Sequence, residues 1–481
     1  MKVLKSFKYN LLFALFLLSI DGQGQKADLP NIIIIYADDL GYGDLGSYGS
    51  TVHKTPNIDK MTSEGIYFTG FYSASPFCTP SRASLLTGSY AKRVNMAVDV
   101  DGYCVVFPVG KKGLNPKEIN IANHLKKSGY NTACIGKWHL GDQQEFLPNN
   151  QGFDYYFGLP YSNDTGPEFA KDNNFDRVFP PIPLVKNTEV IEAPIDQRTL
   201  TQRYTEEAIT YIEKNSNTPF FLYLAHTMPH YPPNASESFR GKSNNGLYGD
   251  SVEEMDWSTG KIIQTLERLK LDKNTLVVFT SDNGAATHYD ELIKGSNKPL
   301  RGWKGSTFEG GMRVPFVAWW PGRIKPGTTT DELATTMDLL PSISSLVNNP
   351  LPKDHKIDGK NILPLLFNEP NATSQYEVFY YYLREQLQAV RKGKWKLHLP
   401  LKKACKGCWK YESEFRPTAL YNLETDLSES IDLKVEYPNV VEELSSYAEL
   451  ARKDLGDGER KGESQRVAGY IKHPVPLEKK D

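Results

Sequence analysis

The sequence lacks an excess of charge of either sign. Its 481 residues carry 56 Lys+Arg and 58 Asp+Glu, a formal net charge of -2. Proteins that bind nucleic acid through its phosphates need a surplus of Lys and Arg, so this balance argues against that class. Low complexity is also absent, because Gly 37 and Pro 31 are ordinary numbers of turn residues and 39% of the chain is hydrophobic. The length suits two to three domain-sized units, or one large α/β domain with an appendage.

Long hydrophobic runs are missing as well. After the first residues, no stretch approaches the roughly 20 apolar residues that span a bilayer, so we expect no membrane span. The run from Leu11 to Ile20 follows three lysines and is too short to span, but it is typical of the hydrophobic region of a signal peptide. We therefore predict a signal peptide over residues 1–25 and an exported protein, periplasmic or secreted.

Cysteine is scarce. The five cysteines are Cys78, Cys104, Cys134, Cys405 and Cys408. An odd number in an oxidising compartment leaves at least one cysteine with a separate fate. The local Cys-Lys-Gly-Cys element at Cys405 and Cys408 is compatible with a small disulfide, with two free thiols, or with half of a metal site.

Hydrophobic runs without alternation recur between the N-terminus and about residue 320. The first, Asn31 to Tyr36, is rich in Ile, which is typical of a strand buried on both faces of a parallel sheet. Helical patterns at Ile119–Ser128 and Ser251–Leu269 lie between such runs, and this alternation predicts an α/β fold. The other runs of the same kind are Tyr130–Ile135, Pro219–Ala225, Thr275–Thr280 and Val314–Trp320.

Polar residues follow several of these predicted strands directly. Each one alone has an ordinary explanation as a turn residue or a helix cap. In open α/β sheets, however, ligands bind beyond the carboxyl ends of the strands, so the shared placement predicts a functional site at that edge. The residues delivered there are Asp38, Asp39, Lys137, His139, His230, Asp282 and Asn283.

The pattern changes after about residue 350. Aromatic and alternating segments at Tyr376–Leu383, Gln386–Leu399 and Ala419–Leu423 indicate strands, and Pro438–Leu455 is an amphipathic helix with proline at its start. We therefore predict a smaller C-terminal α+β subdomain over residues 371–481.

The acidic residues at the strand ends favour a metal. Asp38 and Asp39 are adjacent, and two carboxylates held close repel each other unless a cation or a raised pKa relieves them. Asp282 and Asn283 add a third carboxylate and an amide oxygen. These are hard oxygen donors, so the set favours Ca²⁺ or Mg²⁺ over Zn²⁺.

Cys78 stands at a predicted helix start. Pro80 is expected as the first helical residue, which places Cys78 and Thr79 at the cap, where free backbone N–H groups attract an anion. Arg82 follows Cys78 by four residues and is expected on the same face. The alternative is a buried structural thiol.

The segment Cys78-Thr-Pro-Ser-Arg82, followed by Ala-Ser-Leu-Leu-Thr-Gly, closely resembles the signature of the type I sulfatases, whose cysteine is oxidised to Cα-formylglycine before folding. Asp38-Asp39, the block from Gly136 to Gly141, Asp282-Asn283-Gly284 and the block from Lys304 to Gly311 match the family's other motifs in order. The resemblance runs from about Pro30 to Leu420–Leu423. Around Pro160–Asp164 the chain resembles arylsulfatase A and bacterial carbohydrate sulfatases, although this segment also fits an ordinary surface loop.

The resemblance implies an alkaline-phosphatase-like sandwich with a large mixed, mostly parallel sheet flanked by helices, and a catalytic domain over residues 26–370. It implies a hydrated aldehyde at Cys78 that attacks sulfur, while Arg82, Lys137 and Lys304 spread the negative charge of the sulfate. His139 is implied to take the proton that lets sulfate leave. The implied ligands of Ca²⁺ are Asp38, Asp39, Cys78, Asp282 and Asn283.

The acid that assists the leaving group is a choice between two histidines, with Lys304 as a further group that can stabilise the alkoxide. The family histidine usually follows a proline, and here Pro229 precedes His230. We therefore expect His230 in this role and His226 as a packing or substrate-side residue.

The expected activity is hydrolysis of sulfate esters on a sulfated carbohydrate. The resemblance also implies a biosynthetic partner, a formylglycine-generating or anaerobic sulfatase-maturating enzyme. One alternative is a phosphonate monoester hydrolase or phosphodiesterase on the same fold. Another is a non-catalytic glycan-binding relative, against which the presence of Cys78 and Arg82 argues.

Overall fold

The structure is a computed structural model that describes residues 29–286, 295–401 and 416–479. The predicted signal peptide and the pair Cys405 and Cys408 lie outside these residues. Cys78 and Cys134 are free thiols. None of the described helices has the length and apolar character needed to cross a membrane.

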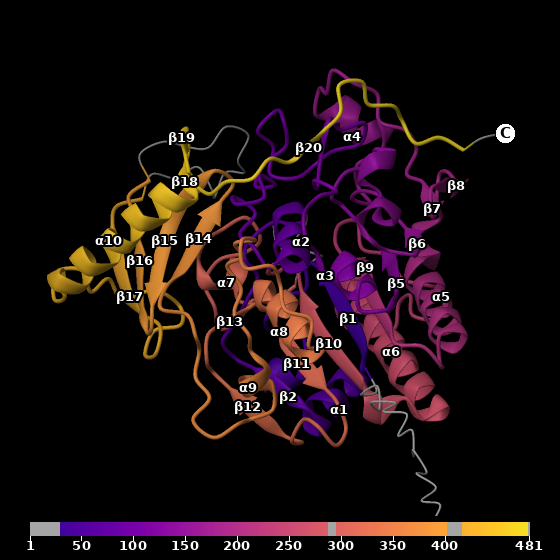
Figure 1. The fold of residues 1–481 in the computed structure, drawn as a ribbon, viewed down its shortest axis with the longest axis horizontal. Helices are drawn as coiled ribbons and strands as arrows, with labels where there is room; N and C mark the ends of the chain where they lie inside the picture. Colours follow the sequence, from indigo (N-terminus) through magenta and orange to yellow (C-terminus); the bar gives the residue numbers. More distant parts are fainter. Residues whose placement is uncertain (1–28, 287–294, 402–415, 480–481) are drawn as a thin grey trace, which may run out of the picture.

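A ten-stranded mixed sheet forms the centre of the molecule (Figure 1). Five neighbouring strands in it run parallel, each paired with the next. In spatial order they are β10 (Thr275–Ser281), β1 (Asn31–Asp38), β9 (Phe220–Pro229), β5 (Asn131–Gly136) and β6 (Tyr155–Gly158). The flanking strands are β12 (Thr328–Thr330), β2 (Ile66–Phe68) and β11 (Phe316–Trp319) beside β10, and β7 (Leu184–Lys186) and β8 (Glu189–Glu192) beside β6.

One predicted strand runs the opposite way. The pattern of Val314–Trp320 placed it with the parallel strands, but β11 pairs antiparallel with β10, with Val277 opposite Trp319. That expectation was wrong because a continuous apolar run reports burial on both faces and carries no information about direction. The carboxyl end of β11 therefore lies at the edge of the sheet away from the predicted site.

Helices cover both faces of the large sheet (Figure 1). In β1, Ile32, Ile34 and Tyr36 pack with α2 (Cys78–Thr87), α3 (Ile121–Lys126) and α8 (Leu339–Leu346). The alternate residues of β1 pack on the other face with α1 (Pro56–Glu64), α5 (Leu200–Lys214) and α6 (Gly246–Leu269). Full burial of each isoleucine contributes about 1.5–3 kcal/mol, so this strand anchors both halves of the core.

The C-terminal part has its own antiparallel sheet, in the order β14 (Phe379–Leu383), β15 (Gln386–Lys392), β16 (Trp395–His398) and β17 (Ala419–Asn422). The predicted run Gln386–Leu399 is thus two strands, which turn at Gly393 with a φ of 54°. Helix α10 (Pro438–Asp454) covers this sheet. The predicted fold, a large mixed sheet with a smaller α+β appendage, is confirmed.

The last residues return to the first half of the chain. Strand β20 (Gly469–Tyr470) pairs antiparallel with β4 (Lys112–Gly113), and Gln143 exchanges two hydrogen bonds with the backbone of Val475. Figure 1 shows this segment crossing over the top of the large sheet. The division at residue 370 stays a prediction.

The remaining elements are short. They are α4 (Pro167–Asp172), α7 (Glu309–Met312), α9 (Leu363–Leu366), β3 (Phe71–Tyr72), β13 (Ala334–Thr335), β18 (Gly456–Asp457), β19 (Arg460–Lys461) and six 3-10 turns, Gly46–Tyr48, Gln144–Phe146, Pro148–Gln151, Gln197–Thr199, Asp272–Asn274 and Thr336–Asp338.

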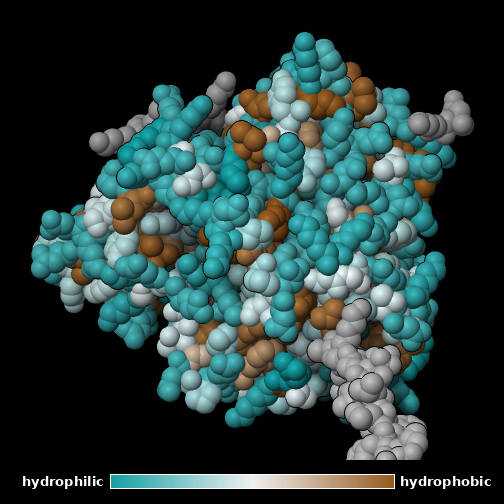
Figure 2. Space-filling view, in the orientation of Figure 1, coloured by the Kyte–Doolittle hydropathy of each residue, from teal (hydrophilic) through white to brown (hydrophobic). Residues whose placement is uncertain are grey.

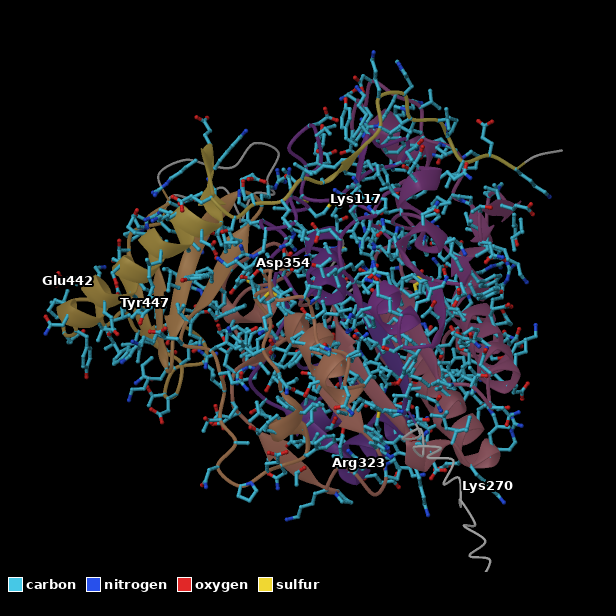
Figure 3. The ribbon with its side chains drawn as sticks, in the orientation of Figure 1. Lys117, Lys270, Arg323, Asp354, Glu442 and Tyr447 are labelled. Atoms are coloured by element: carbon cyan, nitrogen blue, oxygen red, sulfur yellow. The ribbon has the colours of Figure 1, made fainter. Side chains whose placement is uncertain are left out.

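The face of the molecule shown in Figure 2 is mostly hydrophilic, with small separate hydrophobic areas. On α10, Glu442 and Tyr447 mark the outer end of the C-terminal part (Figure 3).

Candidate active site

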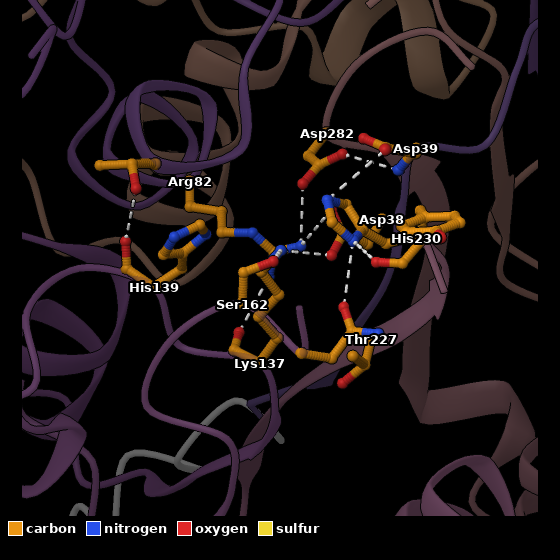
Figure 4. A network of polar contacts seen from close by, with 12 residues as sticks. Asp38, Asp39, Arg82, Lys137, His139, Ser162, Thr227, His230 and Asp282 are labelled. Atoms are coloured by element: carbon orange, nitrogen blue, oxygen red, sulfur yellow. Dashed lines mark hydrogen bonds and ion pairs between the residues drawn. The ribbon is translucent and has the colours of Figure 1, made fainter. Parts of the chain in front are cut away.

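The predicted site residues converge beyond the carboxyl ends of four parallel strands (Figure 4). Asp38 ends β1 and Asp39 follows it, while Asp282 follows β10. Lys137 and His139 follow β5, and His230 follows β9. The sheet thus brings together residues far apart in the chain, as in the hydrogen bond from Asn283 Nδ2 to Asp39 Oδ1 at 2.7 Å, which joins residues 244 positions apart.

Helix α2 presents Cys78 to this cluster, but it begins earlier than the sequence indicated. The helix starts at Cys78 itself, with Phe77 as the extended cap residue, and Pro80 is its third residue. The expectation that Pro80 comes first was wrong, because every position in the first helical turn has a backbone N–H without a helical partner, so proline is tolerated there. Cys78 is buried, and burial together with nearby Asp38 raises the pKa of its thiol well above the usual range.

Arg82 lies on the cluster side of α2, one turn after Cys78. Its Nη2 donates to Asp282 Oδ2 at 2.8 Å and lies 3.6 Å from Asp38 Oδ1, and its Nη1 donates to the Lys137 carbonyl at 2.8 Å. The guanidinium also stacks over the Tyr36 ring at 5.4 Å. Arg82 is fully buried, so these contacts hold its charge in one orientation.

Two lysines complete the cationic side. Lys137 Nζ donates to Asp38 Oδ2 at 2.5 Å and to Ser162 Oγ at 3.2 Å. Lys304 Nζ lies 2.8 Å from Asp39. Burial opposes ionisation of Asp38, but Lys137 and the other cations outweigh it and hold the pKa of that carboxyl well below its usual range.

A glycine is required where β5 delivers Lys137. Gly136 has a φ of 112°, and a Cβ at this position would lie 1.8 Å from the Ala225 carbonyl oxygen of the neighbouring strand. No other residue fits this approach. The Gly-Lys-Trp-His block is therefore a strand end followed by a tight turn that aims Lys137 at Asp38.

The donor set fits a cation. Ligand atoms of Asp38, Asp39, Cys78 and His230 all lie within 4.8 Å of one another. Asp38 Oδ1 and Asn283 Oδ1 are buried with no hydrogen-bond partner among the described residues. Buried oxygen atoms without a partner are costly, and a bound cation would satisfy both.

Asp282 differs from the other predicted ligands. Its Oδ1 accepts from the Asp39 backbone N–H at 3.1 Å, and its Oδ2 accepts from Arg82. Burial and the neighbouring Asp38 raise the pKa of its carboxyl. Asp282 therefore lies beside the other predicted ligands, with both of its carboxylate oxygens already accepting hydrogen bonds. His230 was not among the predicted metal ligands, but a nitrogen of its ring lies close enough to join them.

His139 is held by the backbone around it. Its Nε2 lies 3.2 Å from the Val106 carbonyl oxygen, and its own carbonyl accepts from Thr79 Oγ1 at 3.0 Å. Its Nδ1 is buried and has no hydrogen-bond partner among the described residues. Burial and nearby Lys137 lower the pKa of the imidazole well below its usual range.

The two candidate histidines occupy different surroundings. His230 lines the cavity next to Cys78, with Nε2 3.7 Å from Asp39 Oδ2. Its Nδ1 faces two acceptors, Asn163 Oδ1 at 3.0 Å and the Tyr231 carbonyl at 2.6 Å, so Nδ1 carries the hydrogen. His226 points toward α6, where its Nε2 lies 3.4 Å from Ser258 Oγ. Burial lowers the pKa of the His226 imidazole to about 3.

A cavity of about 470 Å³ opens over these residues, a volume typical of small-molecule sites. Cys78, His139, His230 and Lys304 are part of its lining. The rest of the lining consists of Phe77, Tyr103, Cys104, Val105, Phe107, Ser162, Asp164, Thr165, Phe169, Asn173, Phe175 and Arg384. Only the segment Pro160–Asp164 had been considered as a pocket loop, and its residues Ser162 and Asp164 do reach the cavity.

Two family models match the chain. The one described as Sulfatase covers residues 30–349, and the one described as C-terminal region of aryl-sulfatase covers residues 374–470. Together they span both sheets.

Curated relatives and solved structures agree with these matches. The N-acetylgalactosamine-6-sulfatase of Mus musculus is 41% identical over 390 residues, which are 77% of this chain and 72% of the relative. The arylsulfatase A of Homo sapiens is 40% identical over 386 residues, 77% of this chain and 74% of the relative. The crystal structure of Ps i-CgsB in complex with k-i-k-neocarrahexaose has a TM-score of 0.73 and 29% identity, covering 88% of this chain and 92% of that one.

Proposed function

The chain belongs to the sulfatase family and is a sulfuric ester hydrolase, and we propose that it removes sulfate from a sulfated carbohydrate with a formylglycine at position 78 and a bound Ca²⁺. Its fold is the alkaline-phosphatase-like α/β sandwich. The observation that carries the proposal is the grouping of Arg82, Lys137 and Lys304 with three carboxylates near Cys78, beside a cavity of small-molecule size that Cys78 and Lys304 line.

The state of Cys78 supports a modification. Burial and Asp38 keep its sulfur in the thiol form, which is a poor nucleophile. The hydrate of a formylglycine supplies one hydroxyl that attacks sulfur and a second hydroxyl that allows sulfate to be released. The partner in biosynthesis would be a formylglycine-generating or anaerobic sulfatase-maturating enzyme.

The buried oxygen atoms support a metal. Asp38, Asp39, Asp282 and Asn283, with the oxygen at position 78, would hold Ca²⁺. The ion supplies positive charge that lowers the pKa of a neighbouring hydroxyl and offsets repulsion among the carboxylates.

The cations bind and orient the sulfate group. Arg82 is held rigidly by Asp282 and by the Lys137 carbonyl, and Lys304 reaches the cavity itself. Preorganised positive charge in a water-poor site stabilises the negative charge that grows on the sulfate and on the leaving oxygen. This arrangement also orients the S–O bond to the sugar for cleavage.

The two cavity histidines move protons in the proposal. His230 has its hydrogen-bearing Nδ1 fixed by Asn163 and Tyr231, which leaves Nε2 for the cavity, 3.7 Å from Asp39 Oδ2. In the proposal the ring takes up a second proton at Nε2 and donates it to the departing sugar oxygen. His139 offers Nδ1, which has no partner among the described residues, to accept the proton whose removal releases sulfate.

The substrate class and the location rest on sequence and relatives. One curated relative is named for a sulfated amino sugar, and one structural relative was solved with a neocarrahexaose. An exported enzyme with near-neutral net charge suits an environmental or host glycan. We further propose that residues 26–370 form the catalytic domain and residues 371–481 the C-terminal subdomain.

The test compares the rates at which one preparation of the enzyme hydrolyses different esters. The mass of the peptide that contains residue 78 establishes its chemical state, and rates are then measured on sulfated sugars and on matched phosphate and phosphonate esters. Conversion of Cys78 together with a preference for sulfate supports the proposal. A preference for phosphonate esters would instead favour the phosphonate monoester hydrolase alternative.

A further inference from the structure

Four aromatic side chains, here called the aromatic wall, line the same cavity as Cys78 and Lys304. Tyr103, Phe107, Phe169 and Phe175 all face the cavity and pack on one another, with ring centroids 5.3 Å apart for Tyr103–Phe107 and 4.8 Å for Phe107–Phe175. They come from the loop before residue 110 and from α4 with its following turn. Such a wall offers a flat apolar surface to the C–H face of a sugar ring.

A hydrogen-bond acceptor lies in the same lining. Asp164 Oδ1 is buried and has no hydrogen-bond partner among the described residues. A buried acceptor of this kind needs a donor. A hydroxyl of a sugar ring packed on the aromatic wall supplies one.

The C-terminal sheet contributes an arginine to this cavity. Arg384 is the first of the two residues that connect β14 to β15, and only 6% of it is exposed. Its Nη1 donates to the Gly102 carbonyl at 3.1 Å, so the guanidinium reaches the loop that carries Tyr103. A cation from one sheet thus enters the cavity that belongs to the other.

The backbone of this turn is unfavourable for arginine. Arg384 has a φ of 54°, in the left-handed region that residues other than Gly, Asn and Asp seldom adopt. The turn is held from both sides, because Glu385 pairs with Lys92 and its carbonyl accepts from the Gly458 N–H at 2.7 Å. Strain of this kind persists where surrounding contacts impose it, often at ligand sites.

We infer that Arg384 binds a second anionic group of the substrate, so that the pocket selects a carbohydrate that carries a carboxylate or a further sulfate besides the sulfate to be removed. The inference rests on the proposed function. The sulfate to be removed meets Arg82, Lys137 and Lys304 beside position 78. Arg384 comes from a different sheet and is anchored to the aromatic loop, which places its charge at the sugar.

The test uses full-length enzyme with residue 78 converted and two pairs of substrates. Each pair consists of a monosulfated sugar and the same sugar with either a carboxylate or a second sulfate added. The wild type is expected to show at least a tenfold higher kcat/KM on one of the doubly anionic sugars. Arg384→Gln should reduce that preference by about 10- to 100-fold, mainly through KM, because a charge-assisted hydrogen bond is lost. Arg384→Lys should retain part of it.

Arg460→Gln is the matched control, since it makes the same charge change on an exposed arginine of the C-terminal part. It should keep the preference. A wild type that hydrolyses sulfated sugars without preferring a second anion would overturn the inference and leave the proposed function intact. Equal losses on both members of a pair in Arg384→Gln would also overturn it, as a structural role. A converted enzyme inactive on every sulfate ester would contradict the proposed function itself.

Discussion

Lys396 of β16 donates a hydrogen bond to Glu309 of α7, with 2.9 Å between Nζ and Oε1, and neither side chain is exposed. Glu309 also accepts from the hydroxyls of Tyr381 at 3.0 Å and Tyr72 at 2.5 Å. The ion pair therefore ties the C-terminal sheet to the segment that begins at Lys304. That segment carries Lys304, for which we propose a role in sulfate binding.

Lys396→Met should be strongly destabilising. It removes the main cation from a carboxylate that stays buried, a change that typically costs about 3–5 kcal/mol. Urea titration followed by tryptophan fluorescence measures it. Lys394→Met is the control, because Lys394 is exposed and its ion pair is with exposed Glu424, so the free energy of unfolding of this variant should change by less than about 1 kcal/mol. Similar midpoints for both variants would contradict the structural role of the pair.

Acidification should lower the stability of the folded protein, because it protonates Glu309. Burial alone would raise its pKa, but Lys396 and Arg313 outweigh burial and lower the pKa to about 2 from an unfolded value of 4.5. The stabilisation is therefore fully present above pH 4.5 and is lost as the pH falls toward 2. Glu309→Gln should show a shallower loss of melting temperature over this window.

Asp338 should have the opposite effect, lowering the stability of the folded protein as the pH rises. Burial raises its pKa to about 7 from 3.8, although it accepts from Tyr376 at 2.6 Å. The unfolded chain gives up this proton first, so the carboxyl lowers stability as the pH rises from about 4 to 7. Asp338→Asn should reduce that decline. A larger decline in Asp338→Asn would mean that the carboxyl is ionised in the folded protein.

Replacement of Cys78 should separate folding from turnover. Cys78→Ala removes one buried atom and should fold, with nearly all activity lost. Cys78→Ser should trap a covalent sulfate ester, because serine provides a nucleophile but no second hydroxyl to expel sulfate. Intact mass after incubation with substrate detects the adduct. Full activity in protein whose residue 78 is unmodified cysteine would refute the formylglycine.

Removal of calcium should affect activity and stability together. Three buried carboxylates close to one another are tolerated best around a cation, so chelation should abolish activity and lower the melting temperature. Added Ca²⁺ should restore both. Stoichiometric zinc in the purified protein, with calcium without effect, would show that the ligands were misassigned.

The leaving group should distinguish the two histidines. His230→Ala should lose about 10²- to 10⁴-fold in kcat on a sugar sulfate, whose alkoxide is a poor leaving group, and much less on an activated aryl sulfate. His226→Ala should show no such contrast, since His226 packs against Ser258 beneath the sheet. The two substrates are compared at saturating concentration. A contrast found only in His226→Ala would reverse the assignment.

Much of this organisation is readable in the sequence. The Ile-rich run of β1 shows no alternation because both of its faces are covered, and the acidic residues after it mark the carboxyl edge of the sheet. The family blocks around Cys78, Lys137 and Asp282 lie within a few residues of strand ends or helix starts. Local pattern is sufficient for these elements, because burial and the chemistry of a turn are encoded residue by residue.

Other features were decided only by the tertiary structure. The antiparallel direction of β11 depends on which strand it meets. The entry of Arg384 into the pocket depends on contacts with Gly102 and Lys92, which lie almost 300 positions earlier in the chain. Apolar periodicity specifies which side chains are buried, whereas the packing of the whole core determines which distant segments meet.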